Sequence, residues 1–367
     1  MDYEEIQYQM ALLEAEGVGA TIARKLIDHF GSAKEIFMQT NNLLNTLNKV
    51  GPKLIYTKKN KDLFVEIEKE ITFCERNNIQ ILSVSNDNYP KRLRQCSDAP
   101  IIMYYKGNEL LNNPKVISIV GTRAATAYGK EICRSIIKEL SVHNAVIISG
   151  LAYGIDVQAH NASINNSLPT IGVLAHGLDR IYPKEHAAIA NKMIEEGGLL
   201  TENRLGTIPD RGSFPKRNRI VAGLSDATIV IESAIRGGSM ITANIANNYN
   251  RDVFAIPGRI GNKQSEGCNH LIKINKAHLL QSAKDITYLL GWDIKVKTPK
   301  AVQKQIFNNL SVQEKSIMAT LINETNIGID EIAVKANLPM NIISSQLLLL
   351  EFKGVVKQLP GKKYDVV

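Results

Sequence analysis

Short runs of β-branched and aliphatic residues alternate with stretches of helical periodicity through the middle of the chain, from about residue 79 to about residue 290. The clearest predicted strands are residues 116–120, 145–148, 170–174, 228–231 and 253–256. Four of them run straight into a loop that contains glycine. Helices that cross between such strands make a parallel sheet, so we predict a doubly wound α/β domain. Its glycine loops should meet at the carboxyl ends of the strands, where ligands bind.

The first ~75 residues have the apolar periodicity of helices. Residues 12–27 contain an apolar helix end, a turn at Gly17 and Gly19, and an amphipathic helix, and residues 50–53 fit a degenerate second copy. The pattern resembles a helix-hairpin-helix, in which glycines let backbone N–H groups approach a DNA phosphate. A tight helix–helix turn that needs glycine only for its backbone conformation explains it slightly better.

The C-terminal part begins after a lysine-rich stretch with a proline, residues 293–300, which predicts a linker. Helices are predicted at 312–323, 330–336 and about 340–353, followed by two short strands near 355–357 and 364–366. This is the order of a winged helix. The third helix is apolar with little positive charge, so a protein-contact or regulatory role fits at least as well as DNA reading. We therefore place an N-terminal helical domain at 1–78, the α/β domain at 79–293, a linker at 294–305 and the winged helix at 306–367.

The charge of the chain favours polyanionic partners. The 367 residues carry a formal net charge of +8, and Lys and Arg exchange condensed counterions for phosphate contacts. A basic proteome would explain the same excess, so charge alone does not decide. The four cysteines form no C-x-x-C pair, which predicts neither a metal site nor disulfides and fits a reducing compartment. No apolar run approaches the ~20 residues of a membrane span, and no signal peptide opens the chain, so we expect a cytoplasmic protein.

Two glycine loops follow predicted strands and precede helices. The first contains Gly121, Thr122 and Arg123, and its backbone amides, helix dipole and guanidinium suit a phosphate. It lacks the second and third glycines of G-x-G-x-x-G, and no acidic residue follows where a ribose partner is expected, so we expect no nicotinamide cofactor. The second loop has a serine and two glycines that again suit a phosphate or sugar, namely Ser149, Gly150 and Gly154.

The second loop leads into a helix that carries Asp156 and His160 on one face, since they are four residues apart. A catalytic dyad is one interpretation. We favour a structural hydrogen bond that orients the loop, and Asp156 is also placed to cap the helix.

The most informative segment is residues 208–219, in which cations surround one aromatic residue. Phe214 offers a stacking platform for a base, and the neighbouring arginines offer phosphate contacts. Arg211, Arg217, Asn218 and Arg219 are the predicted polar contacts. The alternative is a helix start with Phe214 in the core and its arginines in salt bridges; we disfavour it because acids are sparse nearby.

Further loops extend the same pattern. Lys184 lies near a predicted helix N-terminus, where its charge opposes the dipole and suggests an anionic ligand. Gly238 and Ser239 precede a helix as an anion nest, and a long polar loop at 257–269 also contains glycine before a helix. Each loop alone is weak support. Several in order predict an elongated phosphate-binding surface.

Together these motifs resemble the DNA-processing protein A family, also called Smf. The resemblance rests on the segments 120–123, 149–156 with His160, 182–184, 214–225, 238–243 and 253–258, and it covers residues 80–290. It departs at Thr122 and His186, where the family often has serine and asparagine. The resemblance implies a Rossmann-like domain that binds single-stranded DNA in natural transformation, dimerises, shields the strand, helps load the RecA recombinase and catalyses no reaction. It also implies that Arg123, Lys184, Phe214 and Arg217 lie in the DNA pocket.

Two other functions remain open at this point. The Rossmann-like domain also resembles nucleotide-hydrolysing relatives of the lysine-decarboxylase-like group, but residues 236–242 lack their proline and glutamate. A double-strand DNA regulator that uses the winged helix is disfavoured by the apolar third helix. The leading hypothesis is a single-strand binder with salt-sensitive affinity and little sequence preference.

Overall fold

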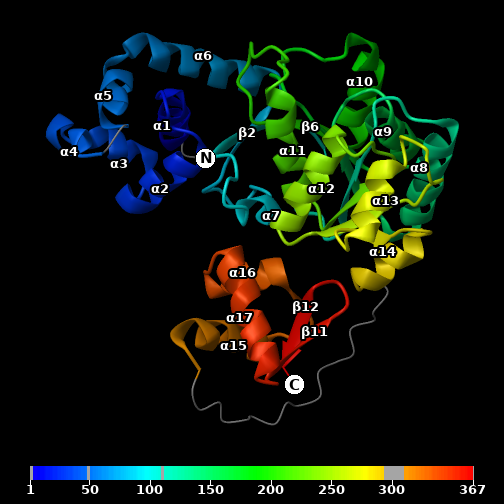
Figure 1. The fold of residues 1–367 in the computed structure, drawn as a ribbon. Helices are drawn as coiled ribbons and strands as arrows, with labels where there is room; N and C mark the ends of the chain where they lie inside the picture. The colour runs from blue at the N-terminus through cyan, green and yellow to red at the C-terminus, as the bar shows by residue number, and fades with distance from the viewer. Residues whose placement is uncertain (1–2, 48–49, 109–110, 293–309, 367) are drawn as a thin grey trace.

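The computed structural model describes residues 3–47, 50–108, 111–292 and 310–366. Figure 1 shows three units along the chain: N-terminal helices, a central α/β domain and a small C-terminal domain. The predicted linker at 294–305 lies outside the described residues. No helix in the described ranges is long and apolar enough to cross a membrane.

The central domain is built on a nine-stranded sheet. In order across the sheet the strands are β1 (Gln80–Ser83), β2 (Ile102–Gly107), β6 (Gly198–Thr201), β5 (Thr170–Val173), β4 (Val146–Ser149), β3 (Val116–Val120), β7 (Ala227–Val230), β8 (Asp252–Ala255) and β9 (His278–Leu279). The strands from β6 to β9 are parallel, whereas β1 and β2 extend one edge antiparallel. The chain moves outward from β3 to β6 and then returns to β7 on the other side of β3. This reversal confirms the predicted doubly wound fold and creates a switch point at the carboxyl ends of β3 and β7.

Helices cover both faces of this sheet, because its central strands are apolar on both sides. In β3, Ile117 and Ile119 pack against α8 (Ala127–Leu140), α9 (Ile155–Asn165) and α14 (Ala283–Leu289). On the opposite face, Val116 and Val120 pack against α11 (Ser213–Gly223), α12 (Gly238–Asn248) and α13 (Glu266–Lys273). The short η1 (Ser141–His143) follows α8, α7 (Lys91–Arg94) precedes β2, and η2 (Lys184–His186) leads into α10 (Ala187–Glu196).

The N-terminal unit contains the predicted helical hairpin. Its helices are α1 (Tyr3–Glu14), α2 (Ala20–Phe30), α3 (Ala33–Met38), α4 (Asn41–Asn45), α5 (Gly51–Lys59) and α6 (Lys61–Arg76). Gly17 turns the chain between α1 and α2 with φ +84°, a conformation that favours glycine. The unit shares one apolar core with Ile102 and Tyr104 of β2. Arg204 ties it to the sheet through ion pairs with Glu70 (2.6 Å) and Glu14 (3.1 Å).

The C-terminal unit has the predicted winged-helix order. It comprises α15 (Val312–Asn323), β10 (Ile327–Gly328), α16 (Ile329–Ala336), α17 (Met340–Phe352), β11 (Val356–Leu359) and β12 (Lys363–Val366). Helix α17 buries Ile343, Leu347 and Leu350 in the small core and exposes Leu348 and Phe352.

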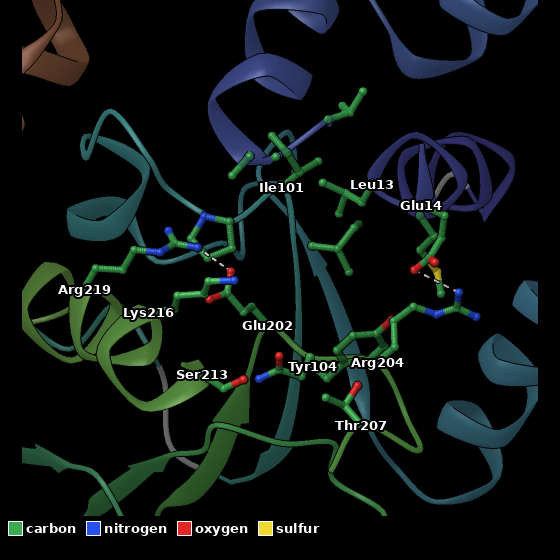
Figure 2. Close-up of a pocket in the computed structure, with 17 residues that line it drawn as sticks. Leu13, Glu14, Ile101, Tyr104, Glu202, Arg204, Thr207, Ser213, Lys216 and Arg219 are labelled. Atoms are coloured by element: carbon green, nitrogen blue, oxygen red, sulfur yellow. Dashed lines mark hydrogen bonds and ion pairs between the residues drawn. The ribbon is translucent and has the colours of Figure 1, made fainter. Parts of the chain in front are cut away.

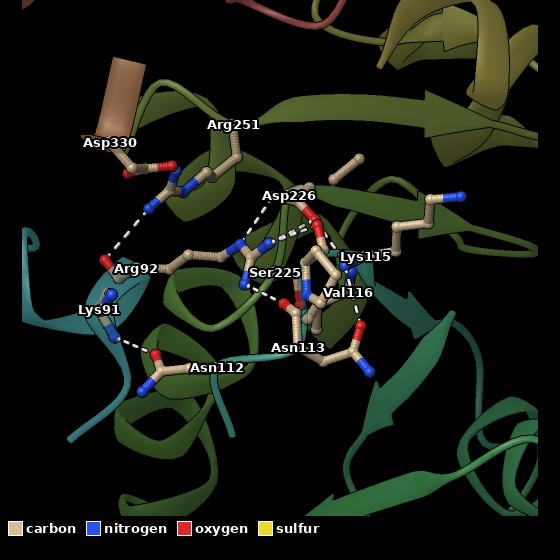
Figure 3. Close-up of polar contacts among 12 residues, drawn as sticks. Lys91, Arg92, Asn112, Asn113, Lys115, Val116, Ser225, Asp226, Arg251 and Asp330 are labelled. Carbon is tan, nitrogen blue, oxygen red and sulfur yellow. Dashed lines mark hydrogen bonds and ion pairs between the residues drawn. The ribbon is translucent and has the colours of Figure 1, made fainter. Parts of the chain in front are cut away.

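An ion pair joins the winged helix to the central domain. Arg251 follows α12, its side chain is only 3% exposed, and it pairs with Asp330 of α16 (Figure 3). Burial disfavours the arginine charge, yet Asp330 raises the pKa of Arg251 above its ordinary value. Beside this pair, Lys362 donates to the Asn250 carbonyl (2.7 Å), and its burial lowers its pKa. The docked position of the winged helix is therefore specified by charges that lie out of water.

We expect Asp330→Ala to loosen this docking, because it leaves the guanidinium of Arg251 buried without its partner. Loss of one member of a buried pair costs about 3 kcal/mol. The only tryptophan, Trp292, lines the cleft between the two units, so its fluorescence in a urea titration should report earlier release.

Lys335→Ala is the matched control, because Lys335 lines the same cleft but its ion pairs with Glu324 and Glu331 are solvent-exposed and lie within the winged helix. Such surface pairs contribute at most about 1 kcal/mol. Equal urea midpoints for the Asp330→Ala and Lys335→Ala proteins would contradict the assignment.

Candidate nucleic-acid interface

A pocket opens where the carboxyl ends of β3, β4 and β5 face the start of α11. Its apolar wall comes from Leu151, Ala152, Val173, Leu174, Ala175 and Pro183, and its polar and aromatic lining from Arg123, Tyr153, His176, Tyr182, Phe214 and Arg217. Lys184 is exposed and directly follows Pro183 of that wall. The structure thus brings the residues that the resemblance placed in a DNA pocket to one edge of the sheet.

Phe214 is half-buried and does not belong to the apolar core. The guanidinium of Arg123 lies 5.2 Å from its ring centroid, and the Tyr182 ring lies 6.3 Å away. Tyr182 is 50% exposed. The rings of Phe214 and Tyr182 can stack on unpaired bases, and the guanidinium of Arg123 beside them can contact a phosphate. Tyr182 is not among the predicted site residues, although its place before Pro183 and Lys184 was a usable indication.

Arg217 is buried, in contrast to the exposed phosphate contact that the sequence suggested. Its guanidinium donates to the carbonyl of Val173, and its Nε donates to Asn218 Oδ1 (3.2 Å). Asp156 faces it across Gly150, and a Cβ at Gly150 would collide with both side chains. Burial lowers the pKa of Arg217 and raises the pKa of Asp156. Gly150 therefore makes room for two buried side chains of opposite charge where α11 meets the strand ends.

The N-terminus of α8, where the first glycine loop was expected to hold a phosphate, contains a carboxylate of the protein itself. Glu232 follows β7, is 1% exposed and accepts hydrogen bonds from the backbone N–H (2.9 Å) and hydroxyl of Thr126. Its backbone carbonyl accepts from the N–H of Thr122 (2.8 Å). The dipole and amides of α8 are thus already neutralised, which leaves Arg123 as the anion-binding group of this loop. The same carboxylate stands where a nucleotide phosphate would sit at the switch point.

The other predicted glycines and serines divide into packed and open positions. A Cβ at Gly121 would meet Ile155, and one at Gly154 would meet the backbone of Thr122 and Arg123. The hydroxyl of Ser149 is buried and donates to the Ile119 carbonyl. By contrast, Gly238 begins α12 with open space around its Cα, beside the buried Ser239, whose hydroxyl donates to Ser233 (2.8 Å). Close approach of backbone serves internal packing in the first two loops, whereas Gly238 is exposed.

The basic segment of α11 has two flanks. Phe214 and Arg217 face the pocket, whereas Arg219 lies on the other flank, pairs with Glu202 and donates to the Asp98 carbonyl. The expectation that nearby acids are sparse was therefore wrong. Arg211 is exposed before the helix and Asn218 is half-buried beside Arg217.

The chain is similar to known proteins over most of its length. The model of the DNA recombination-mediator protein A family matches residues 80–291, and that of the DprA winged helix domain matches residues 304–362. The chain belongs to the DNA recombination-mediator protein A family. Protein Smf of Synechocystis is 31% identical over the full length of both chains, and the DNA processing protein DprA of Streptococcus pneumoniae is 42% identical over 56% of this chain and 72% of its own.

Solved structures of two family members resemble this fold. The X-ray structure of DprA from Streptococcus pneumoniae superposes with TM-score 0.67 at 33% identity, covering 76% of this chain and 96% of that one. DprA from Helicobacter pylori superposes with TM-score 0.52 at 31% identity, covering 57% of this chain and 93% of that one. The structure of the Helicobacter pylori protein concerns the mode in which that protein binds single-stranded DNA.

His160 has a structural role in this family member. Its Nε2 donates to the Gly150 carbonyl, which can only accept, and its Nδ1 lies 2.7 Å from the Thr170 hydroxyl, which itself donates to the Ile147 carbonyl (2.9 Å). Asp156 instead accepts from the Ala152 N–H (3.4 Å). The two side chains are each engaged elsewhere, which confirms the loop-orienting interpretation over the catalytic dyad.

The buried His160 should make the domain less stable in acid. Burial lowers its pKa to about 4, whereas the unfolded chain titrates near pKa 6.5. The unfolded state binds the extra proton between these values, so stability is lost as pH falls from 6.5 toward 4, by about 3 kcal/mol. We expect His160→Gln to reduce that loss in urea titrations at pH 7 and pH 4. His278→Gln, at a half-exposed position, serves as control. An unchanged acid dependence in His160→Gln would refute this assignment.

Proposed function

We propose that this chain is a single-stranded DNA-binding recombination mediator that processes DNA taken up in transformation. The main support for this proposal is the cation–aromatic arrangement of Arg123, Phe214 and Tyr182 at the carboxyl edge of a parallel sheet. The single-stranded DNA binding described for the Helicobacter pylori relative supports it.

The arrangement favours unpaired bases for a physical reason. A base can stack on Phe214 or Tyr182 only if its faces are free, and in a duplex they are covered by neighbouring bases. Arg123 and Lys184 then contact phosphates, and Gly238 with Ser239 extends the edge along which the backbone would run. We place Gly121, Thr122, Ser149, Gly150 and Gly154 in this site as the residues that shape its loops.

The finer parts of the proposal follow from the family resemblance. The chain acts in the cytoplasm as a homodimer, shields the incoming strand from nucleases and helps load RecA onto it. It carries out no chemical step on the strand and uses no cofactor. The internal carboxylate of Glu232 at the α8 N-terminus supports binding without nucleotide turnover, since it fills the place of a nucleotide phosphate.

Removal of both free cations of the pocket should weaken binding of every single-stranded sequence. For Arg123→Ala combined with Lys184→Ala we expect a large loss of affinity, and the slope of log K against log salt should fall by about 1.4, or 0.7 per phosphate contact. Gel shifts of oligonucleotides across a salt series measure both quantities. Arg134→Ala with Lys138→Ala is the charge-matched control, because both residues are exposed on α8 outside the pocket. Unchanged binding by the Arg123/Lys184 variant would refute the site.

Phe214→Ala should remove the preference for unpaired bases. Stacking on an aromatic side chain contributes about 1–3 kcal/mol per base, so single-strand affinity should fall roughly 5- to 150-fold while weak duplex binding stays the same. Competition between single- and double-stranded oligonucleotides measures the preference, and Phe214→Tyr should retain it. A Phe214→Ala protein that still discriminates as wild type would show that the ring does not stack on the strand.

A further inference from the structure

A second cleft lies on the other flank of α11, between the N-terminal hairpin and the sheet domain. Its walls include Leu13 of α1, Val18 and Ala20 at the start of α2, Ile101 before β2, and Lys216 and Arg219 of α11 (Figure 2). No residue of the pocket around Phe214 lines it. The first turns of α11 therefore separate two hollows, and the basic segment contributes to both.

The charges of this cleft are not all satisfied within the protein. Arg219 pairs with Glu202, and Arg204 pairs with Glu14 and Glu70. Lys216 is exposed and makes no ion pair within the described ranges. Lys216 thus places a positive charge at the rim beside an apolar wall.

The start of α2 is the part of the cleft that favours an anionic ligand. It has no side-chain cap and no acidic residue in its first turn, so its amides and positive dipole end are uncompensated. Tyr104, which lines the floor (Figure 2), is 1% exposed, and its hydroxyl lies against the Glu70 carboxylate.

We infer that this cleft binds the continuation of the single strand held at Phe214, an inference that rests on the proposed function. A phosphate sits at Lys216 and the first turn of α2, and the adjoining sugar and base pack on Leu13 and Val18. One helix, with a diameter of about 10–12 Å, separates the two hollows, so only a strand that continues beyond the pocket around Phe214 reaches the cleft. The hairpin then acts as the second half of one nucleic-acid track, which gives its glycine turn a role beyond packing.

The test uses variants that should fold, because an acid in the first turn of a helix is favourable for the helix dipole. Ala20→Glu places a negative charge in the cleft, and Thr21→Glu places it on the exposed side of the same turn. We expect Ala20→Glu to bind a hexanucleotide as wild type does, yet to lose affinity several-fold for a twenty-mer. Thr21→Glu should bind both as wild type. Lys216→Gln should lower the salt slope for the twenty-mer by about 0.7, the value for one phosphate contact.

The outcomes separate this inference from the proposed function. If the wild-type protein binds neither oligonucleotide, the proposed function itself is refuted. Wild-type binding with Ala20→Glu and Lys216→Gln both indistinguishable from it on the twenty-mer overturns the inference alone. Loss of hexanucleotide binding in Ala20→Glu also overturns it, because the cleft would then not be a separate part of the track.

Occupancy can be read directly by thiol labelling. The four native cysteines are buried, so Leu13→Cys introduces a single reactive thiol in the cleft. We expect the twenty-mer, and not the hexanucleotide, to protect this thiol from maleimide. Equal protection by free deoxyadenosine monophosphate would overturn the inference in favour of an independent nucleotide site. Absence of protection by the twenty-mer would also overturn it, because the strand would then not occupy the cleft.

Discussion

The burial of Arg217 against Asp156 across Gly150 is the interaction on which the candidate site depends. It fixes the first turns of α11 at the carboxyl ends of β4 and β5, because the guanidinium also donates to the Val173 carbonyl. With the helix held there, Phe214 must face the pocket and Lys216 must face the opposite cleft. A buried charge pair of this kind gives specificity of placement more than stability, since each ion has lost its water.

Some charged side chains pair within the protein, whereas others remain available to a ligand. Glu232 neutralises the start of α8, Glu202 neutralises Arg219, and Asp330 neutralises Arg251. Each of these pairs holds an element or a domain in place. Arg123 and Lys184 remain accessible along the carboxyl edge, whereas other exposed cations, such as Lys138 of α8, lie elsewhere. Net positive charge alone therefore overstates the binding surface.

The sequence predicted the architecture well because the apolar periods are strong. All five predicted strands of the sheet were found within one residue, and the three helices of the winged helix nearly as closely. The site was harder to predict. A sequence shows that Arg217 and Arg219 are basic, but not that one is buried and the other paired with Glu202, fifteen or more positions away. Likewise, the glycines at 121, 150 and 154 suggested ligand approach, whereas their close neighbours are residues of the protein. Long-range packing decides these cases, and no local pattern encodes it.

The same division of charges bears on the winged helix. Helix α17 occupies the position of a DNA-reading helix in the winged-helix order, yet it contains no lysine or arginine between Met340 and Phe352. Lys353, which follows it, pairs with Glu314 at 2.6 Å. The exposed side of α17 carries Leu348 and Phe352, and Ser344 of this helix contacts Asn250 of the central domain. A helix in the major groove needs cations toward phosphates as well as donors toward bases, and α17 offers only uncharged donors such as Asn341 and Ser345. The lack of cations on α17 and the contact of Ser344 with the central domain therefore favour contact with protein.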